Sequence, residues 1–186
     1  MELLPTALPD VKVLKPRRYG DHRGWFCETF RLAWFEPLGL PREWVQDNHS
    51  LSGPIGTLRG LHYQVAPKAQ AKLLRVLRGA VLDVAVDIRR SSPTFGKHAI
   101  QELSAENGLQ LCIPAGFAHG FVTLAPDTEV LYKVTEYYSP EHERGILWND
   151  PDLGIPWGIA AEAANLSGRD TKHPRLKDLP SGDLFA

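Results

Sequence analysis

Histidine is the residue type in this chain that is best suited to chemistry near neutral pH, and the 186 residues include seven. Imidazole titrates at about pH 6.5 and also binds transition metals, so a histidine in a pocket indicates acid–base catalysis or a metal site. Two segments stand out, Gly60-Leu-His62-Tyr-Gln64 and Pro114-Ala-Gly-Phe-Ala-His119. Each offers one imidazole, and Gln64 stands where a His-x-His pair needs its second. We expect no metal, because such sites take roughly three or more protein donors. A hydrogen-bonded structural role for either histidine stays open.

Short strands are expected to carry these histidines. The strongest strand signal runs from Ala80 to Ile88, where aliphatic residues occupy one face at a period of two and Asp83 and Asp87 fall on the other. Further strands are expected at 24–30, 58–64, 71–77, 98–103, 109–113, 120–124 and 129–138. Helical patterns occur only at 32–38 and 160–165. This spacing, with sixteen Gly and fifteen Pro, favours an all-β sandwich or barrel.

The length suggests one domain over residues 1–186. Four prolines after residue 150 predict that 139–186 is a largely irregular C-terminal wrap around the barrel. The net charge of −1 argues against a nucleic-acid binder held by a strong basic field. The N-terminus lacks a basic signal-peptide region and no apolar run is long enough to span a membrane, so we expect a cytoplasmic protein without membrane contact.

The second histidine segment, with Gly108 six residues ahead of Pro114, resembles the second motif of the cupin superfamily. The proline and glycine make the turn that delivers the next strand, on which His119 faces the barrel interior. The segment around His62 corresponds to the first cupin motif, which normally supplies His-x-His and a carboxylate to a metal.

A wider set of segments resembles the dTDP-4-dehydrorhamnose 3,5-epimerase family, in order from about residue 12 to residue 176. The matching segments include Asp21-His-Arg-Gly-Trp-Phe-Cys-Glu28, Gln46-Asp-Asn-His-Ser50, Gly56-Thr-Leu-Arg-Gly-Leu-His-Tyr-Gln64, Gln70-Ala-Lys72, Asp83-Val-Ala-Val-Asp87, Pro114-Ala-Gly-Phe-Ala-His-Gly-Phe121, Tyr132-Lys-Val-Thr135 and Leu166-Ser-Gly-Arg-Asp170. Many such segments in register are far more specific than any one of them.

The resemblance implies a cupin-type antiparallel jelly-roll barrel with short flanking helices, working as a homodimer without cofactor or metal. The implied substrate is dTDP-4-dehydro-6-deoxy-D-glucose, whose C4 ketone acidifies the hydrogens on C3 and C5. By family position His62 is the base, paired with Asp170, and Lys72 meets the enolate oxygen. Tyr132 matches the proton donor that inversion requires on the opposite face.

The resemblance also implies a set of substrate contacts. Arg23 and Arg59 suit the diphosphate, because guanidinium groups bind phosphate oxygens in pairs. The remaining implied contacts are Phe26 and Tyr138 stacking on thymine, Glu28, Gln46 and Asn48 for base and sugar, His119 near the reacting oxygens, Glu143, and Arg169 where the family pattern has lysine. In the family the N-terminal strand region reaches the partner's site, so Arg23 could act there. The alternatives are a 3- or 5-epimerase of a related deoxysugar pathway, a non-catalytic sugar-nucleotide-binding cupin, or a metal-dependent cupin.

Overall fold

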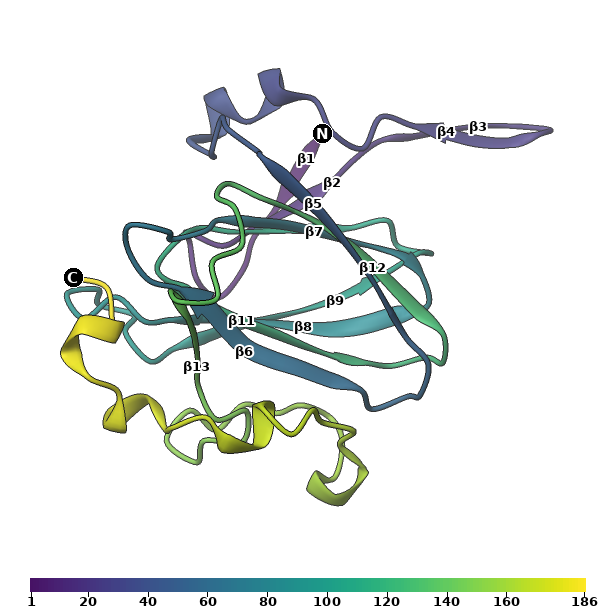
Figure 1. Ribbon diagram of the computed structural model, residues 1–186. Coiled ribbons are helices and arrows are strands. Elements are labelled where there is room, and N and C mark those ends of the chain that lie inside the picture. The colour runs from purple at the N-terminus through teal and green to yellow at the C-terminus, as the bar shows by residue number, and fades with distance from the viewer.

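The computed structural model describes residues 1–186, and it consists of two antiparallel sheets that face each other (Figure 1). The six-stranded sheet has the order β1-β2-β10-β7-β12-β5. Its strands are β1 (Glu2–Leu4), β2 (Lys12–Lys15), β10 (Gln110–Ile113), β7 (Lys72–Arg78), β12 (Thr128–Val134) and β5 (Gln46–Ser52). The five-stranded sheet has the order β13-β6-β11-β8-β9. Its strands are β13 (Glu143–Gly145), β6 (Leu58–Gln64), β11 (Phe117–Thr123), β8 (Ala80–Asp87) and β9 (His98–Ser104). The predicted all-β architecture is confirmed.

A hairpin and a C-terminal segment complete the fold. Strands β3 (Arg18–Asp21) and β4 (Gly24–Cys27) form a separate two-stranded hairpin that projects from the body of the molecule (Figure 1). After β13 the chain runs beneath the five-stranded sheet as loops and short 3-10 turns, drawn in yellow in Figure 1. The 3-10 turns are η1 (Leu32–Trp34), η2 (Glu36–Leu38), η3 (Ala161–Ala163), η4 (Asp170–Lys172), η5 (Leu176–Asp178) and η6 (Ser181–Asp183). None of these helices could cross a membrane.

Strand β8 has both faces buried. Val81 and Ala85 point into the core between the two sheets, whereas Val84 and Val86 pack on the other side against Trp157 and its neighbours in the C-terminal segment. Fully burying one such side chain stabilises the fold by roughly 1.5–3 kcal/mol. The aspartates of β8 therefore do not face solvent, and each needs a partner inside the protein.

Most strands lie close to the predicted ranges, and the differences have local causes. The predicted strand at 129–138 ends at Val134, so Tyr138 lies in a loop, and the predicted helices at 32–38 and 160–165 are only 3-10 turns. Strand β5 was missed because Gln, Asp, Asn and Ser are poor strand formers, yet it pairs with β12 from Gln46 to Ser52. Strands β1, β2, β3 and β13 were also missed, and each has only three or four residues.

Candidate active site

A cavity of about 570 Å³ lies between the sheets, a volume typical of ligand sites. Strands β5 and β12 line it from one sheet and β6 and β11 from the other, and the turn around Asp170 closes it. It brings together most of the residues singled out in the sequence, namely Gln46, Asn48, Arg59, His62, Lys72, His119, Tyr132, Tyr138, Glu143, Arg169 and Asp170. The exceptions are Arg23, Phe26 and Glu28.

His62 and Asp170 form a hydrogen-bonded pair although 108 residues separate them. His62 Nε2 donates to Asp170 Oδ1 at 2.6 Å, and the carboxylate is almost fully buried. Burial alone raises the pKa of Asp170, but the hydrogen bond and charge of His62, with help from Ser167, lower it below its usual value. With Nε2 engaged as a donor, Nδ1 is the ring nitrogen that can accept a proton.

Lys72 begins β7 beside this pair. Its Nζ donates to the backbone oxygen of His62 at 3.2 Å. Desolvation lowers the pKa of Lys72 to about 8, against the attraction of Asp83 and Glu143. The ammonium is therefore a partly desolvated cation at neutral pH, and such a cation stabilises a nearby anion more strongly than one in bulk water.

His119 sits directly opposite His62 in the β6–β11 pairing and is tied to Asp83. The Nε2 atom of His119 lies 3.0 and 3.1 Å from the two carboxylate oxygens of Asp83, and both side chains are buried. Burial lowers the pKa of His119 and outweighs the charge and hydrogen bond of Asp83, which raise it, while the nearby Lys72 and His62 lower it further. Asp83 thus has the internal partner that its burial requires, and it fixes the orientation of the His119 ring.

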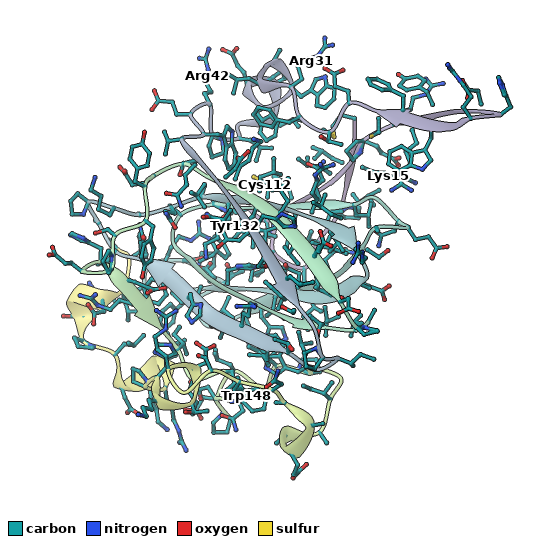
Figure 2. The ribbon with its side chains drawn as sticks, turned by 45° about the vertical axis from the view of Figure 1, so that its right-hand side comes forward. Lys15, Arg31, Arg42, Cys112, Tyr132 and Trp148 are labelled. Carbon is teal, nitrogen blue, oxygen red and sulfur yellow. The ribbon has the colours of Figure 1, made fainter.

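Tyr132 lies on β12, between Asn48 of β5 and Leu74 of β7. Figure 2 shows it near the centre of the molecule, away from the projecting hairpin. Burial raises the pKa of Tyr132, an effect that the nearby Arg59 guanidinium partly offsets, so the phenol is protonated at neutral pH. The Arg59 side chain is held by Ser52 Oγ and the backbone oxygen of Leu51, each at 3.2 Å.

The binding candidates at the cavity rim are joined to one another. Glu143 Oε2 accepts hydrogen bonds from Tyr138 Oη at 2.9 Å and from Arg169 Nη1 at 2.5 Å. Gln46 donates to Asn48 at 2.8 Å and accepts from the backbone N–H of Tyr138 at 3.1 Å. Arg169 therefore presents a cation, paired with Glu143, at the rim.

Arg23, Phe26 and Glu28 do not reach this cavity. Arg23 pairs with Asp21 at 2.6 Å within the hairpin, and Glu28 pairs with Arg31 at 2.5 Å. Phe26 is 69% exposed. The hairpin extends away from the body, so the cavity within one chain lacks these three side chains (Figure 1).

Several residues in or beside the cavity had no assigned role in the sequence analysis. Ser50, Gln64, Gln70 and Ser167 occur in the segments that matched the family, so the resemblance contained the signal. Asp83 was visible as an acidic residue in an apolar strand. His173, beside the His62–Asp170 pair, had no signal, because nothing in its local sequence distinguishes it from a surface loop residue.

Comparisons with known proteins match nearly the whole chain to one family. The family model for dTDP-4-dehydrorhamnose 3,5-epimerase matches residues 5–178. The dTDP-4-dehydrorhamnose 3,5-epimerase of Sinorhizobium fredii is 53% identical over 94% of this chain and 89% of its own length. A dTDP-4-dehydro-6-deoxyglucose 3-epimerase from a Streptomyces species is 39% identical over 92% of this chain and 87% of its own.

A solved structure extends the likeness to the whole fold. The crystal structure of dTDP-6-deoxy-D-glucose-3,5-epimerase from Legionella pneumophila, in complex with dTDP-4-keto-L-rhamnose, superposes with a TM-score of 0.94. It is 44% identical, and the match covers 99% of this chain and 97% of that one. The predicted cupin-type fold and the predicted family are thereby confirmed. The chain belongs to the dTDP-4-dehydrorhamnose 3,5-epimerase family.

Proposed function

We propose that this epimerase inverts C3 and C5 of dTDP-4-dehydro-6-deoxy-D-glucose through an enolate, giving dTDP-4-dehydro-L-rhamnose. The observation that carries the proposal is the origin of two side chains: His62 comes from β6 of one sheet and Tyr132 from β12 of the opposed sheet, and both line one cavity. Inversion needs a base and an acid on opposite faces of the sugar ring. Two opposed sheets supply that arrangement.

His62 acts as the base in this proposal. Its Nδ1 removes the proton next to the C4 ketone, while Nε2–H keeps its hydrogen bond to Asp170. The imidazolium that forms is stabilised by the buried carboxylate, as in other histidine–aspartate pairs. Asp170 also fixes the ring tautomer, so that the lone pair faces the cavity rather than the protein.

Lys72 stabilises the enolate oxygen. Charge develops on this oxygen only as the proton leaves, so a donor aimed there acts on the transition state more than on the bound ketone. Removing a comparable donor in other enzymes costs about 2.7–4 kcal/mol. The partial burial of Lys72 and its fixed hydrogen bond to His62 support this assignment.

Tyr132 donates the new proton. Because its pKa is raised by burial, the phenol is neutral before the step and available as an acid. Its hydroxyl has no protein hydrogen-bond partner, and the side chain lines the cavity, which leaves the proton free for substrate. The cationic Arg59 stabilises the phenolate that remains.

The nucleotide is held at the rim by polar and aromatic groups. Arg59 binds the diphosphate, Gln46 and Asn48 contact the base and sugar, Tyr138 stacks on thymine, and His119 supports the sugar oxygens near the reacting carbons. Glu143 and Arg169 form an ion pair that a bound diphosphate can reorganise, since Arg169 can exchange its carboxylate partner for phosphate oxygens.

We propose a homodimer in which the hairpin completes the partner's cavity. Three hairpin aromatics are more than half exposed, Tyr19 at 55%, Trp25 at 59% and Phe26 at 69%. Exposed aromatics on a projecting ribbon are typical of an interface. In the dimer, Arg23, Phe26 and Glu28 act on the substrate in the partner's cavity. An Arg23→Ala chain mixed with a His62→Asn chain tests this, because activity should return in mixed dimers, in which one cavity has both intact residues.

The C-terminal wrap and the barrel act as one domain over residues 1–186. The segment 139–186 supplies Glu143, Arg169 and Asp170 to a cavity whose other walls are strands, so neither part has a complete site alone. The reaction moves protons without net oxidation, so we propose no cofactor. Cys27 and Cys112 are unpaired, which supports a reducing, cytoplasmic setting.

Deuterium uptake tests the reaction directly. Incubating dTDP-4-dehydro-6-deoxy-D-glucose with the enzyme in deuterated water should label both C3 and C5, and trapping with a ketoreductase and NADPH should give the L-rhamno product. Label at one carbon alone would favour the narrower epimerase activity of the Streptomyces relative. Ligand binding without exchange would favour a non-catalytic role.

A further inference from the structure

A second imidazole stands beside the catalytic pair, and the proposed mechanism does not use it. His173 Nε2 lies 3.6 Å from Asp170 Oδ1, the same oxygen that His62 Nε2 approaches at 2.6 Å. The two imidazole rings are 5.5 Å apart and nearly perpendicular, at 78°. His173 Nε2 is fully buried and has no hydrogen-bond partner. A buried polar atom of this kind requires an explanation.

The backbone makes room for this ring. Gly145 of β13 pairs directly with His62 of β6, and a Cβ at Gly145 would overlap the His173 ring. The glycine therefore lets His173 pack against bare backbone next to His62. Two imidazole nitrogens and one carboxylate oxygen thus converge, all within 4.8 Å of one another.

We propose that His62, Asp170 and His173 bind Zn²⁺ or a similar divalent transition metal, and that the bound ion inhibits the epimerase. The inhibitory part of this proposal rests on the proposed function of His62. A set of two imidazoles and one carboxylate is a common zinc donor set, with water or a ligand in the fourth position. The two cupin motifs by themselves offer too few donors, but two of the three donors here, Asp170 and His173, come from the C-terminal wrap.

The spacing of the donors suits a small ion. Zinc binds histidine nitrogen and carboxylate oxygen at about 2.0–2.2 Å, so tetrahedral donors stand roughly 3.3 Å apart. The measured separations of Asp170 Oδ1 from the two nitrogens, 2.6 and 3.6 Å, lie on either side of that value. Binding the ion would open the short hydrogen bond by less than an ångström and bring the two imidazole nitrogens, which lie within 4.8 Å of each other, to a similar separation. Of the neighbouring cations, Arg169 is already paired with Glu143, and Lys72 donates to the backbone oxygen of His62.

Metal binding removes the base by changing its tautomer. A metal on His62 Nε2 requires the lone pair there, so Nε2 gives its proton to solvent while Nδ1 takes one up from solvent, and the ring stays neutral with its one proton on Nδ1. Nδ1 is the atom that must accept the proton from substrate. A ring with Nδ1–H cannot accept it, and the Asp170 carboxylate is occupied by the metal.

The test uses Zn²⁺ and Co²⁺ alone on the full-length enzyme after chelator treatment and dialysis. Equilibrium dialysis should find about one Zn²⁺ per chain, and Co²⁺ should give the visible d–d bands of a low-coordinate site. Exchange of substrate protons in deuterated water should fall as Zn²⁺ is added and recover with EDTA. This assay needs no coupling enzyme, so inhibition of a ketoreductase cannot contribute.

His173→Phe keeps a flat ring against Gly145 but removes the ligand. The inhibition of each variant is measured relative to its own metal-free rate. The Zn²⁺ concentration that gives half-inhibition should be at least tenfold higher for His173→Phe than for wild type, equivalent to about 1.4 kcal/mol. His98→Phe on β9, outside the cavity, is the matched control and should behave as wild type. His173→Gln gives the same comparison if the phenylalanine variant does not fold.

Absence of bound Zn²⁺ in the wild type, or equal inhibition of wild type and the His173 variants, overturns the proposal. Exchange by the metal-free wild type tests the proposed function separately. If that exchange is absent while one Zn²⁺ still binds through His173, the proposed function fails and the metal site stands.

Discussion

Replacing Tyr132 by phenylalanine separates proton abstraction from inversion. The change deletes one hydroxyl that has no protein partner and leaves the ring packed against the core cluster of the two sheets, so stability should change by less than about 0.5 kcal/mol. His62, Asp170 and Lys72 remain, so the enolate should still form. The imidazolium can return a deuteron only to the face from which it took the proton.

The size of the effect follows from the loss of a general acid. Positioned acids contribute about a hundred- to ten-thousand-fold in rate, equivalent to roughly 2.7–5.5 kcal/mol. Inversion should fall within that range while exchange with retained configuration continues. The ratio of exchange to inversion should therefore rise more than tenfold, which corresponds to a difference of over about 1.4 kcal/mol between the two barriers.

One NMR time course in deuterated water measures both quantities, from deuterium uptake and product stereochemistry. Tyr138→Phe is the matched control, because its hydroxyl bonds Glu143 at the rim and it should alter KM without altering the ratio. An unchanged ratio in Tyr132→Phe would refute the assignment and leave water or another side chain as the acid.

Four further outcomes are expected. Lys72→Met should raise the barrier to proton exchange by about 2.7–4 kcal/mol, measured by single-turnover exchange. Calorimetry should show little change in the affinity for dTDP. Asp170→Asn should slow exchange while substrate still binds, because the ring loses its charge partner but the cavity keeps its shape; tight binding with wild-type exchange would contradict this. EDTA should leave activity intact, and a loss restored by one divalent ion would show a required metal. Burial raises the pKa of Asp87, but hydrogen bonds from Arg89, Ser92 and Thr94 lower it well below its usual range. Its stabilisation is therefore present above the unfolded pKa of 3.8 and lost as pH falls below it, so Asp87→Asn should flatten the acid side of a plot of Tm against pH.

The strands that carry aliphatic residues at a period of two were predictable, and the polar strand was not. Strand β6 has the predicted bounds, 58–64, and β8 differs by one residue at its end. Strand β5 has the sequence of a loop because nearly all its residues are polar, although in the fold its side chains alternate between partly buried and exposed sides. Its partly buried side includes Gln46, Asn48 and Ser50, which line the cavity, so the strand is polar because it forms part of the site.

Contacts between residues that lie far apart in the chain could not be predicted from the sequence. Nothing in the local pattern around Asp170 or His173 shows that the C-terminal wrap returns to β6, and only the packed structure brings them to His62. The resemblance supplied Asp170 and could not supply His173. It also supplied Arg23, Phe26 and Glu28 and implied the partner's site for Arg23, but it did not show the projecting hairpin that carries Arg23 and Phe26, with Glu28 directly after it.

The packing of the C-terminal wrap bears on the proposed catalytic pair of His62 and Asp170. Asp170 must stay within hydrogen-bond distance of His62, yet it sits on a single 3-10 turn, which has little stability of its own. The apolar side chains around it, including Leu166 before the turn and Leu176 after it, pack onto the five-stranded sheet. The burial of Trp148 and Trp157, earlier in the chain, in the same cluster also holds the segment in place. Replacing the Trp157 side chain by a smaller one would therefore slow proton abstraction by lengthening the distance between His62 and Asp170, although Trp157 does not line the cavity.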